Sequence, residues 1–172
     1  MISLDAGLCE LRTLQPRDAE SMAQYANNER IWQNVRDYFP HPYRIEDAVS
    51  FIATECNRET QQNLGVIYED ACIGVIGFYP MQDVYRLTAD FGYWIGEPFW
   101  GKGITSAAIS VMAEYIFNHT GIIRLQSSVF DFNKASMRVL AKNGFTLDCI
   151  ARKGAIKNGE IVDEYRFSRL KS

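Results

Sequence analysis

The residues between Gly92 and Ser106 combine an extended segment, a glycine-containing turn and the start of a long helical pattern, in the sequence GYWIGEPFWGKGITS. Such a turn directs several backbone N–H groups at one point, and the positive end of the following helix dipole faces the same point. Gly101 and Gly103 would let the backbone approach a ligand without interference from a Cβ atom. These residues favour equally a phosphate-binding turn and a plain strand-to-helix turn in which glycine permits close packing.

The elements that must position this turn follow from the periodicity of the apolar residues. Extended patterns occupy residues 8–14, 64–68, 72–79, 87–95, 122–130, 145–155 and 161–170. Helical patterns occupy a segment that opens at 17 after Pro16, and residues 29–35, 46–58, 101–118 and 133–143. The order predicts a mixed sheet, because Asn158-Gly159 indicates an antiparallel hairpin and the connection through 101–118 suggests a parallel strand pair.

The segment 101–118 carries the clearest helical pattern. Its apolar residues recur with the spacing of one helix face, and they are Ile104, Ala107, Ala108, Val111, Met112, Tyr115 and Ile116. Gly121 is predicted to end the helix. We therefore expect a long helix that begins in the glycine turn and is buried along one stripe.

Length and composition indicate one domain over residues 1–172. Hydrophobic residues make up 47% of the chain and charged residues 23%, which is ordinary for a globular domain. No apolar run is long enough to span a bilayer, and the first ten residues lack a basic start followed by an apolar block. These patterns exclude a membrane protein and predict a cytoplasmic location. The four cysteines and two histidines have no metal-ligand spacing, so we expect free thiols and no metal site.

The net charge of −3 is unevenly distributed. Residues 1–120 carry 8 basic and 16 acidic side chains, whereas residues 121–172 carry 10 basic and 5 acidic ones. A basic final third could face an anionic ligand, or could be an ordinary solvated surface. The acidic balance of the whole chain argues against a dedicated nucleic-acid-binding protein.

Two motifs resemble those of a known family. Residues 100–105, WGKGIT, resemble the pyrophosphate loop of the GNAT N-acetyltransferases, whose pattern is Arg/Gln-x-x-Gly-x-Gly/Ala. Residues 133–136, NKAS, followed by KNGF at 142–145 resemble the family's second motif. The early residues Leu11-Arg12 and Pro16-Arg17-Asp18-Ala19 are similar to those of the ribosomal-protein N-terminal alanine/serine acetyltransferases. Two departures are Trp100 in place of Arg/Gln and Thr105 in place of the final Gly/Ala.

This resemblance and the element order together imply an α/β GNAT fold, with a mixed, mainly antiparallel sheet of six or seven strands and helices on both faces. The implied cosubstrate is acetyl-CoA. The residues expected to bind it are Trp94, Ile95, Trp100, Gly101, Lys102, Gly103, Ile104, Thr105, Ser106 and Asn133. For Lys102 the alternative is a solvated lysine, and for Asn133 it is simple helix capping.

Catalysis requires a base to take a proton from the amine and an acid to protonate the leaving thiolate. The position at which many members of the family carry a tyrosine acid is Leu140 here, and the resemblance assigns that role instead to Ser136. The alternative for Ser136 is a first-turn serine bonded to its own backbone. Asp90 is the candidate base, with substrate anchoring and a structural carboxylate as alternatives. Ala155 occupies a position at which some relatives are thought to carry a glutamate base.

The predicted activity is acetyl transfer from acetyl-CoA to a primary amine, either a protein N-terminus or a small-molecule amine, by direct attack in a ternary complex. The acceptor pocket is expected from the early helices, residues 37–43 and the last hairpin, with Tyr38, Phe39, His41, Tyr43 and Tyr79 as aromatic candidates. The alternatives are an acetyl-CoA-binding sensor without transfer activity and an unrelated nucleotide-phosphate binder. The family resemblance also suggests a homodimer.

Overall fold

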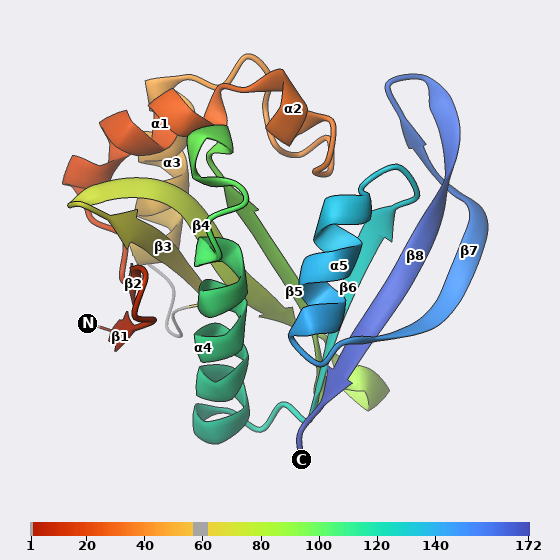
Figure 1. Ribbon diagram of the computed structural model, residues 1–172. Coiled ribbons are helices and arrows are strands. Elements are labelled where there is room, and N and C mark those ends of the chain that lie inside the picture. Colours follow the sequence, from red (N-terminus) through yellow and green to blue (C-terminus); the bar gives the residue numbers. More distant parts are fainter. Residues whose placement is uncertain (1, 57–61) are drawn as a thin grey trace. The chain divides into compact units, whose positions relative to one another are not determined.

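The computed structural model describes residues 2–56 and 62–172. The strands are β1 (Ser3–Asp5), β2 (Glu10–Arg12), β3 (Asn63–Tyr68), β4 (Ala71–Pro80), β5 (Thr88–Ile95), β6 (Arg124–Phe130), β7 (Thr146–Lys157) and β8 (Glu160–Leu170). The α-helices are α1 (Ala19–Ala26), α2 (Glu29–Trp32), α3 (Ile45–Cys56), α4 (Ile104–His119) and α5 (Lys134–Lys142) (Figure 1). Residues 57–58, which the sequence adds to α3, lie outside the described residues.

The strands form a mixed sheet in the order β1-β2-β3-β4-β5-β6-β8-β7. The predicted class, a mainly antiparallel α/β sheet, is confirmed, but the predicted count of six or seven strands is wrong. The additional strand is β1, which pairs antiparallel with β2 and places Leu4 opposite Leu11. With three residues, β1 is too short to show a clear alternation of polar and apolar side chains.

The chain divides into two compact units, each described here by itself. Unit 1 comprises residues 1–77 and 93–112, and unit 2 comprises residues 78–92 and 113–172. The boundaries fall inside β4, β5 and α4. Unit 1 therefore contains the glycine turn and the start of α4, while unit 2 contains α5 and the last two strands.

The core of unit 1 lies between the early helices and strands β3 and β4. Its buried side chains come from α1, α3 and the two strands, and include Met22, Ile52, Ile67 and Val75. In the same unit, Arg12 and Asp18 form a buried ion pair of 2.8 Å, with side chains 8% and 2% exposed. Asp18 also ends the 3-10 turn η1 (Pro16–Asp18), so this pair fixes the point at which α1 begins.

Helix α4 begins at Ile104 and not at residue 101 as the sequence pattern suggested. Gly101 and Gly103 adopt positive φ angles, which are incompatible with a right-handed helix. The helix ends at His119, next to the predicted end at residue 118, and the Thr120 hydroxyl donates to the carbonyl of Ile116 at 2.7 Å. Burial extends beyond the predicted stripe, because Ile109, Ala113 and Phe117 are also buried. The helix is therefore enclosed over a broader arc than one amphipathic face.

In unit 2, β5 and β6 form a parallel pair and β6, β8 and β7 form antiparallel pairs. The parallel ladder joins Thr88–Asp90 to Arg124–Gln126, and both strands continue beyond its last pair. Figure 1 shows the long β7–β8 hairpin, which ends at the C-terminus. α5 ends at Lys142, and Gly144, with a φ of +79°, reverses the chain into β7.

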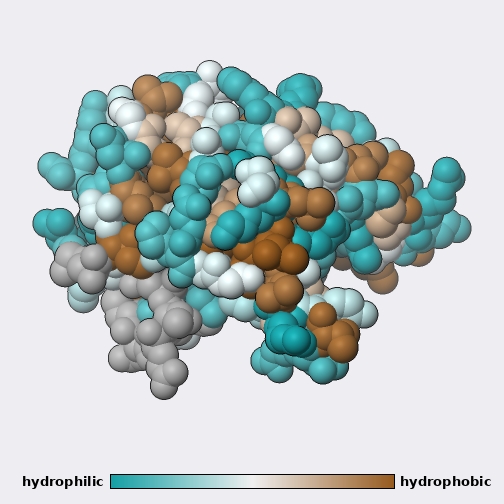
Figure 2. All heavy atoms as spheres, turned by 90° about the horizontal axis from the view of Figure 1, so that it is seen from below, coloured by the Kyte–Doolittle hydropathy of each residue, from teal (hydrophilic) through white to brown (hydrophobic). Residues whose placement is uncertain are grey.

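Apolar side chains remain exposed in unit 2 around the start of β5. Val84 and Tyr85 are exposed in the turn before this strand, and Leu87 and Ile123 follow on neighbouring segments, where the Ile123 N–H donates to the Leu87 carbonyl at 2.9 Å. The space-filling view from below shows hydrophobic residues at the surface, bordered by hydrophilic ones (Figure 2). The residues described thus include solvent-exposed apolar side chains as well as a closed core.

Candidate active site

The predicted phosphate-binding turn connects β5 to α4 through the 3-10 turn η3 (Glu97–Phe99). Gly101 and Gly103 have φ angles of +74° and +84°. A Cβ atom on Gly101 would meet no described atom within 4 Å, so its glycine is required by backbone conformation, and the space beside it is open. A Cβ on Gly103 would lie 3.3 Å from Cδ1 of Leu8. The turn thus combines open space with a conformation that glycine readily adopts.

The start of α4 adds the electrostatics that an anion requires. The first-turn N–H groups of a helix point out of its N-terminal end, where the helix dipole is positive. α4 is 16 residues long and has no acidic residue in its first turn. Ile104 is 2% exposed, so its contribution to a ligand can come only from its backbone. These features fit the pyrophosphate that the sequence motif predicts.

Trp100 closes the turn through its side chain. Its indole Nε1 donates a hydrogen bond of 2.7 Å to the carbonyl oxygen of Ile95, at the end of β5. The indole is 39% exposed, so only part of it is packed. Trp100 therefore stabilises the turn by a neutral hydrogen bond at the position where the motif carries Arg or Gln.

The end of β5 presents one backbone edge to β4 and the other away from it. The N–H of Gly96 donates to the carbonyl of Ile73 on β4 at 2.7 Å. Because backbone groups alternate between the two edges of a strand, those of Ile95 face the opposite edge. This is the edge at which the sequence predicts that Ile95 pairs with the amides of a pantetheine arm.

Two residues that the sequence did not single out, Asn28 and Arg30, hold η3 in place through Glu97. Asn28 donates from Nδ2 to Oε2 of Glu97 at 2.7 Å, and Arg30 forms an ion pair with the other carboxylate oxygen. The Asn28 hydrogen bond and then the Arg30 charge lower the pKa of Glu97. Arg30 also lies over the ring of Trp100, 5.5 Å from its centroid. Lys102, in contrast, places its ammonium over Phe99 at 5.5 Å.

The aromatic residues predicted to line an acceptor pocket have different environments. Phe39 contacts both Tyr43, at 4.9 Å, and Trp94 on β5, at 5.7 Å between ring centroids. Tyr43 belongs to the core, and burial raises the pKa of its hydroxyl. His41 stacks on Trp32 at 5.0 Å. Tyr38 is 96% exposed and Tyr79, in unit 2, is 43% exposed.

In unit 2, Asn133 and Ser136 stand at the start of α5. The Ser136 N–H donates to Oδ1 of Asn133 at 3.1 Å, so Asn133 is the N-cap of this helix. The cap uses the side-chain carbonyl, and a ligand contact would therefore come from the amide N–H2 group of Asn133. Next to them, the Lys134 ammonium lies 5.0 Å from the ring centroid of Tyr165. Leu140 is completely buried, as expected of a residue without a chemical role.

Asp90 lies at the last residue pair of the β5–β6 ladder, opposite Gln126. Its Oδ1 accepts a hydrogen bond of 2.8 Å from Nε2 of Gln126. This amide also approaches the sulfur of Met81 at 3.5 Å. Asp90 is half-buried, and the two parallel strands continue past this last pair.

Two acidic residues of β8, Asp163 and Glu164, form hydrogen bonds. Arg166 donates from Nε to Oε1 of Glu164 at 2.8 Å, and the hydrogen bond raises the pKa of Arg166. The Glu164 side chain is only 16% exposed. Asp163 accepts from the N–H of Lys153, which has a φ of +53° at a β-bulge. Ala155 lies in register with Val162 beside the same bulge.

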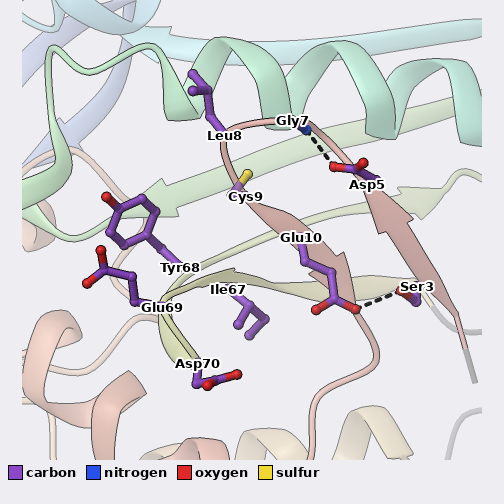
Figure 3. Close-up of a pocket in the computed structure, with 10 residues that line it drawn as sticks. All are labelled: Ser3, Asp5, Gly7, Leu8, Cys9, Glu10, Ile67, Tyr68, Glu69 and Asp70. Carbon is purple, nitrogen blue, oxygen red and sulfur yellow. Dashed lines mark hydrogen bonds between the residues drawn. The ribbon is translucent and has the colours of Figure 1, made fainter.

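A pocket of about 560 Å³ opens in unit 1 beside the β1–β2 and β3–β4 turns. Figure 3 shows its acidic side chains, which are Asp5, Glu10, Glu69 and Asp70. None of the described residues that line it is Lys or Arg, and none is a predicted site residue. Four carboxylates disfavour a pyrophosphate, so this pocket does not suit an anionic cosubstrate.

Among residues 2–56 and 62–172, no helix is long and apolar enough to cross a membrane. In the same residues, no cluster of three or more His, Cys, Asp or Glu side chains is arranged to hold a metal ion.

Comparisons with known proteins agree with the geometry. The model of the acetyltransferase (GNAT) domain family matches residues 9–146. An uncharacterized N-acetyltransferase, YoaA of Bacillus subtilis, is 30% identical over 94% of this chain and 92% of its own. The putative ribosomal N-acetyltransferase YdaF of the same species is 28% identical over 94% of this chain and 90% of its own.

Among solved structures, the ribosomal L7/L12 alpha-N-protein acetyltransferase RimL, in complex with coenzyme A, has the same fold. Its TM-score is 0.85 with 20% identity, and the match covers 98% of each chain. The predicted resemblance to GNAT enzymes is thus confirmed by the family match and by relatives that include a ribosomal-protein acetyltransferase. This chain belongs to the GNAT family of N-acetyltransferases.

Proposed function

We propose that this enzyme transfers the acetyl group of acetyl-CoA to a primary amine by direct attack in a ternary complex. The observation that carries the proposal is the turn between β5 and α4, where two glycines with positive φ precede the N-terminus of a 16-residue helix. That combination suits a pyrophosphate. The cosubstrate brings an activated thioester, and the residues of the chain must bind it, orient it and move protons.

The residues proposed to hold acetyl-CoA divide by the part of the cosubstrate they suit. The backbone of Ile95 suits the amides of the pantetheine arm, as does the Asn133 amide group, whereas the backbone of Trp94 faces β4. The turn from Trp100 through Ser106 suits the pyrophosphate, with the positive charge of Lys102 nearby. Anion binding at this turn rests on backbone N–H groups, so side-chain substitutions there that preserve φ should have modest effects.

The acceptor is proposed to be the α-amino group of a protein N-terminus or a small-molecule amine. The YdaF and RimL names support a ribosomal-protein acceptor by similarity. A primary amine is protonated at neutral pH and must lose a proton before it can attack a carbonyl carbon. The new C–N bond forms as the C–S bond breaks, and the thiolate that leaves takes up a proton.

Two side chains of unit 2 are proposed for these proton transfers. Ser136 would pass a proton to the thiolate through its hydroxyl and take one back from water, so that the serine ends the step protonated; its place in the first turn of α5, after the Asn133 cap, supports this role. Asp90 would accept the proton of the amine, which is supported by its half-buried place at the last β5–β6 pair and by its hydrogen bond from Gln126.

The experiment that tests the proposal follows loss of thioester absorbance from acetyl-CoA with a panel of N-terminal peptides, polyamines and amino acids. Thiol-reagent detection of CoA is avoided because Cys149 is an exposed free thiol. We expect turnover with one class of amine. We expect Ser136→Ala to lower kcat by about 10²-fold or more, whereas the exposed Ser110→Ala on α4 should leave it unchanged.

Two other results would change the proposal. Binding of acetyl-CoA without turnover of any amine would support a module without transfer activity. An unchanged kcat in Ser136→Ala would remove this serine from the mechanism. The homodimer, the cytoplasmic location and the treatment of residues 1–172 as one functional domain stay predictions, and light scattering would test the first of them.

A further inference from the structure

The turn that precedes the pyrophosphate loop is attached to α2 through one carboxylate. Glu97 is the first residue of η3. One of its carboxylate oxygens accepts from Asn28 at 2.7 Å, and the other is paired with Arg30. Asn28 is at the same time the N-cap of α2, because its Oδ1 accepts from the N–H of Arg30 at 2.8 Å. The start of α2 and the start of η3 are therefore held by a single side chain.

Arg30 reaches the loop by a second route. Its guanidinium carbon lies 5.5 Å from the ring centroid of Trp100, a distance typical of a cation–π contact. Trp100 in turn bonds to the Ile95 carbonyl at 2.7 Å. Arg30 thus contacts Glu97, the first residue of η3, and Trp100, the residue that follows η3. A displacement of α2 would shift both ends of the turn together.

The segment that contains Arg30 also contacts the end of β5. Phe39, from the loop that follows α2, packs edge-on against Trp94 at 5.7 Å. Tyr43, at the end of the same loop, is anchored to Asn27 through its N–H at 3.1 Å. Residues 28–43, which the sequence predicts for the acceptor side, therefore contact the strand and the turn predicted for acetyl-CoA.

We propose that Asn28, Arg30 and Glu97 are positioning residues for acetyl-CoA binding. They do not touch the reacting atoms, and they act by fixing the turn 97–100, from which the pyrophosphate loop begins. This inference rests on the proposed function. It assigns to the acetyl-CoA site three supporting residues that lie outside both sequence motifs. Coupling between two parts of a protein is reciprocal. Because residues 28–43 stabilise the loop that binds acetyl-CoA, bound acetyl-CoA also stabilises residues 28–43.

The solvent exposure of the Arg30–Glu97 ion pair decides whether its loss is measured as lower stability or as weaker binding. The Arg30 side chain is 69% exposed and that of Glu97 is 32% exposed. Ion pairs this accessible contribute little to global stability. Their loss should leave the thermal midpoint nearly unchanged but should loosen the loop, and a loop that is less well ordered before binding has a lower affinity for its ligand. The expected signature is weaker acetyl-CoA binding in a normally folded enzyme.

The test measures the dissociation constant for acetyl-CoA by calorimetry in the full chain. We expect Arg30→Met and Glu97→Gln each to weaken binding by about 3- to 10-fold, and the double variant to be no weaker than the single ones. The matched control is Arg36→Met, which removes the same charge from an exposed position in the same segment. It should bind acetyl-CoA as the wild type does.

A further variant separates positioning from helix capping. Asn28→Ser keeps a good N-cap residue but removes the amide donor to Glu97. We expect it to raise the KM for acetyl-CoA by a similar factor with kcat within about twofold, because the reacting atoms are not contacted. Glu97→Asp, which keeps the charge, should recover part of the affinity lost in Glu97→Gln.

The outcomes distinguish this inference from the proposed function. Failure of the wild-type protein to bind acetyl-CoA would overturn the proposed function itself. Normal binding by the wild type, Arg30→Met and Glu97→Gln alike would overturn only the positioning role. Additive losses in the double variant, or an equal loss in Arg36→Met, would also overturn it, since these results would indicate independent contacts or a general charge effect.

Discussion

The indole N–H of Trp100 donates to the carbonyl of Ile95, 2.7 Å away, across the turn that leads into α4. Ile95 is the last residue of β5, and Trp100 immediately precedes the glycine loop. This bond links the end of β5 to the residue before the glycine loop, and it uses the Ile95 carbonyl as its acceptor. In the usual family motif the place of Trp100 is taken by Arg or Gln, so here a neutral aromatic donor has replaced a long polar side chain.

Replacing this tryptophan by phenylalanine tests the hydrogen bond without removing the ring. Trp100→Phe keeps an aromatic surface for Arg30 but has no N–H. Loss of one hydrogen bond of this kind costs about 1 kcal/mol, so we expect acetyl-CoA to bind about fivefold more weakly. Calorimetry measures this directly. Phe132→Leu, an exposed aromatic of unit 2, is the control, and equal affinities for Trp100→Phe and wild type would show that the bond is dispensable.

At Gly101 the effect of backbone conformation can be tested separately from the effect of steric crowding. A Cβ at this residue would meet no described atom within 4 Å, yet its φ is +74°. Gly101→Ala should therefore cost about 1 to 2 kcal/mol in strain alone, which lowers the thermal midpoint by a few degrees and weakens acetyl-CoA binding.

The matched control is Gly121→Ala. Gly121 has equally open surroundings but no positive φ. It should have little effect on either measurement. If Gly101→Ala were as stable as Gly121→Ala and bound acetyl-CoA equally well, the turn would not depend on its left-handed residue.

Asp90→Asn distinguishes a base from a structural carboxylate. The amide keeps an oxygen that can accept the hydrogen bond from Gln126 but cannot take up a proton. If Asp90 is the base, kcat should fall by about 10²- to 10⁴-fold while the dissociation constant for acetyl-CoA is unchanged. The comparison is Asp131→Asn, in the turn between β6 and α5. A lower thermal midpoint with a normal kcat would assign Asp90 a structural role instead.

The buried thiols of unit 1 predict a loss of stability at alkaline pH. Burial raises the pKa of Cys72 to about 12 and, together with the nearby Asp5 charge, that of Cys9 to about 11, from a usual value of 9.0. Above pH 9 the unfolded chain therefore releases protons that the folded chain retains, so stability is full below pH 9 and falls as the pH rises toward 12.

Denaturant titrations at several alkaline pH values measure this slope. Cys72→Ala should reduce the slope of stability against pH, because it removes one group that stays protonated only in the folded state. This effect on the slope is independent of the stability that the substitution costs at neutral pH. Among the described cysteine side chains, Cys149 is exposed and should react with iodoacetamide in the native protein, whereas Cys9 and Cys72 should not. A slope unaffected by Cys72→Ala would contradict this account.

The sequence predicted the fold wherever one local pattern dominates. Most strands and helices were placed to within a few residues, because their apolar periodicity and turn residues agree. The short strand β1 has only three residues and was missed. The start of α4 was placed three residues too early, because a helical pattern does not reveal that Gly101 and Gly103 have left-handed backbones.

The candidate site was predictable only where it is local in sequence. Gly101, Gly103 and Asn133 lie in compact motifs, and the structure places each in the expected turn or cap. Glu97 belongs to neither of the two sequence motifs. Its partner Arg30 is 67 residues away, and a pairing over that separation leaves no periodic or spacing signal in one sequence. The Gln126–Asp90 bond is hidden for the same reason, since it depends on strand register.

The boundaries between the two compact units fall inside β4, β5 and α4 and not in linkers. A gene fragment encoding either unit would have to sever a helix and two strands. The severed end of α4 would include Met112 and Ala113, both completely buried in the intact chain. Neither unit is therefore suited to separate expression, and attempts to exchange one of them with that of a relative would have to join the chains within regular secondary structure.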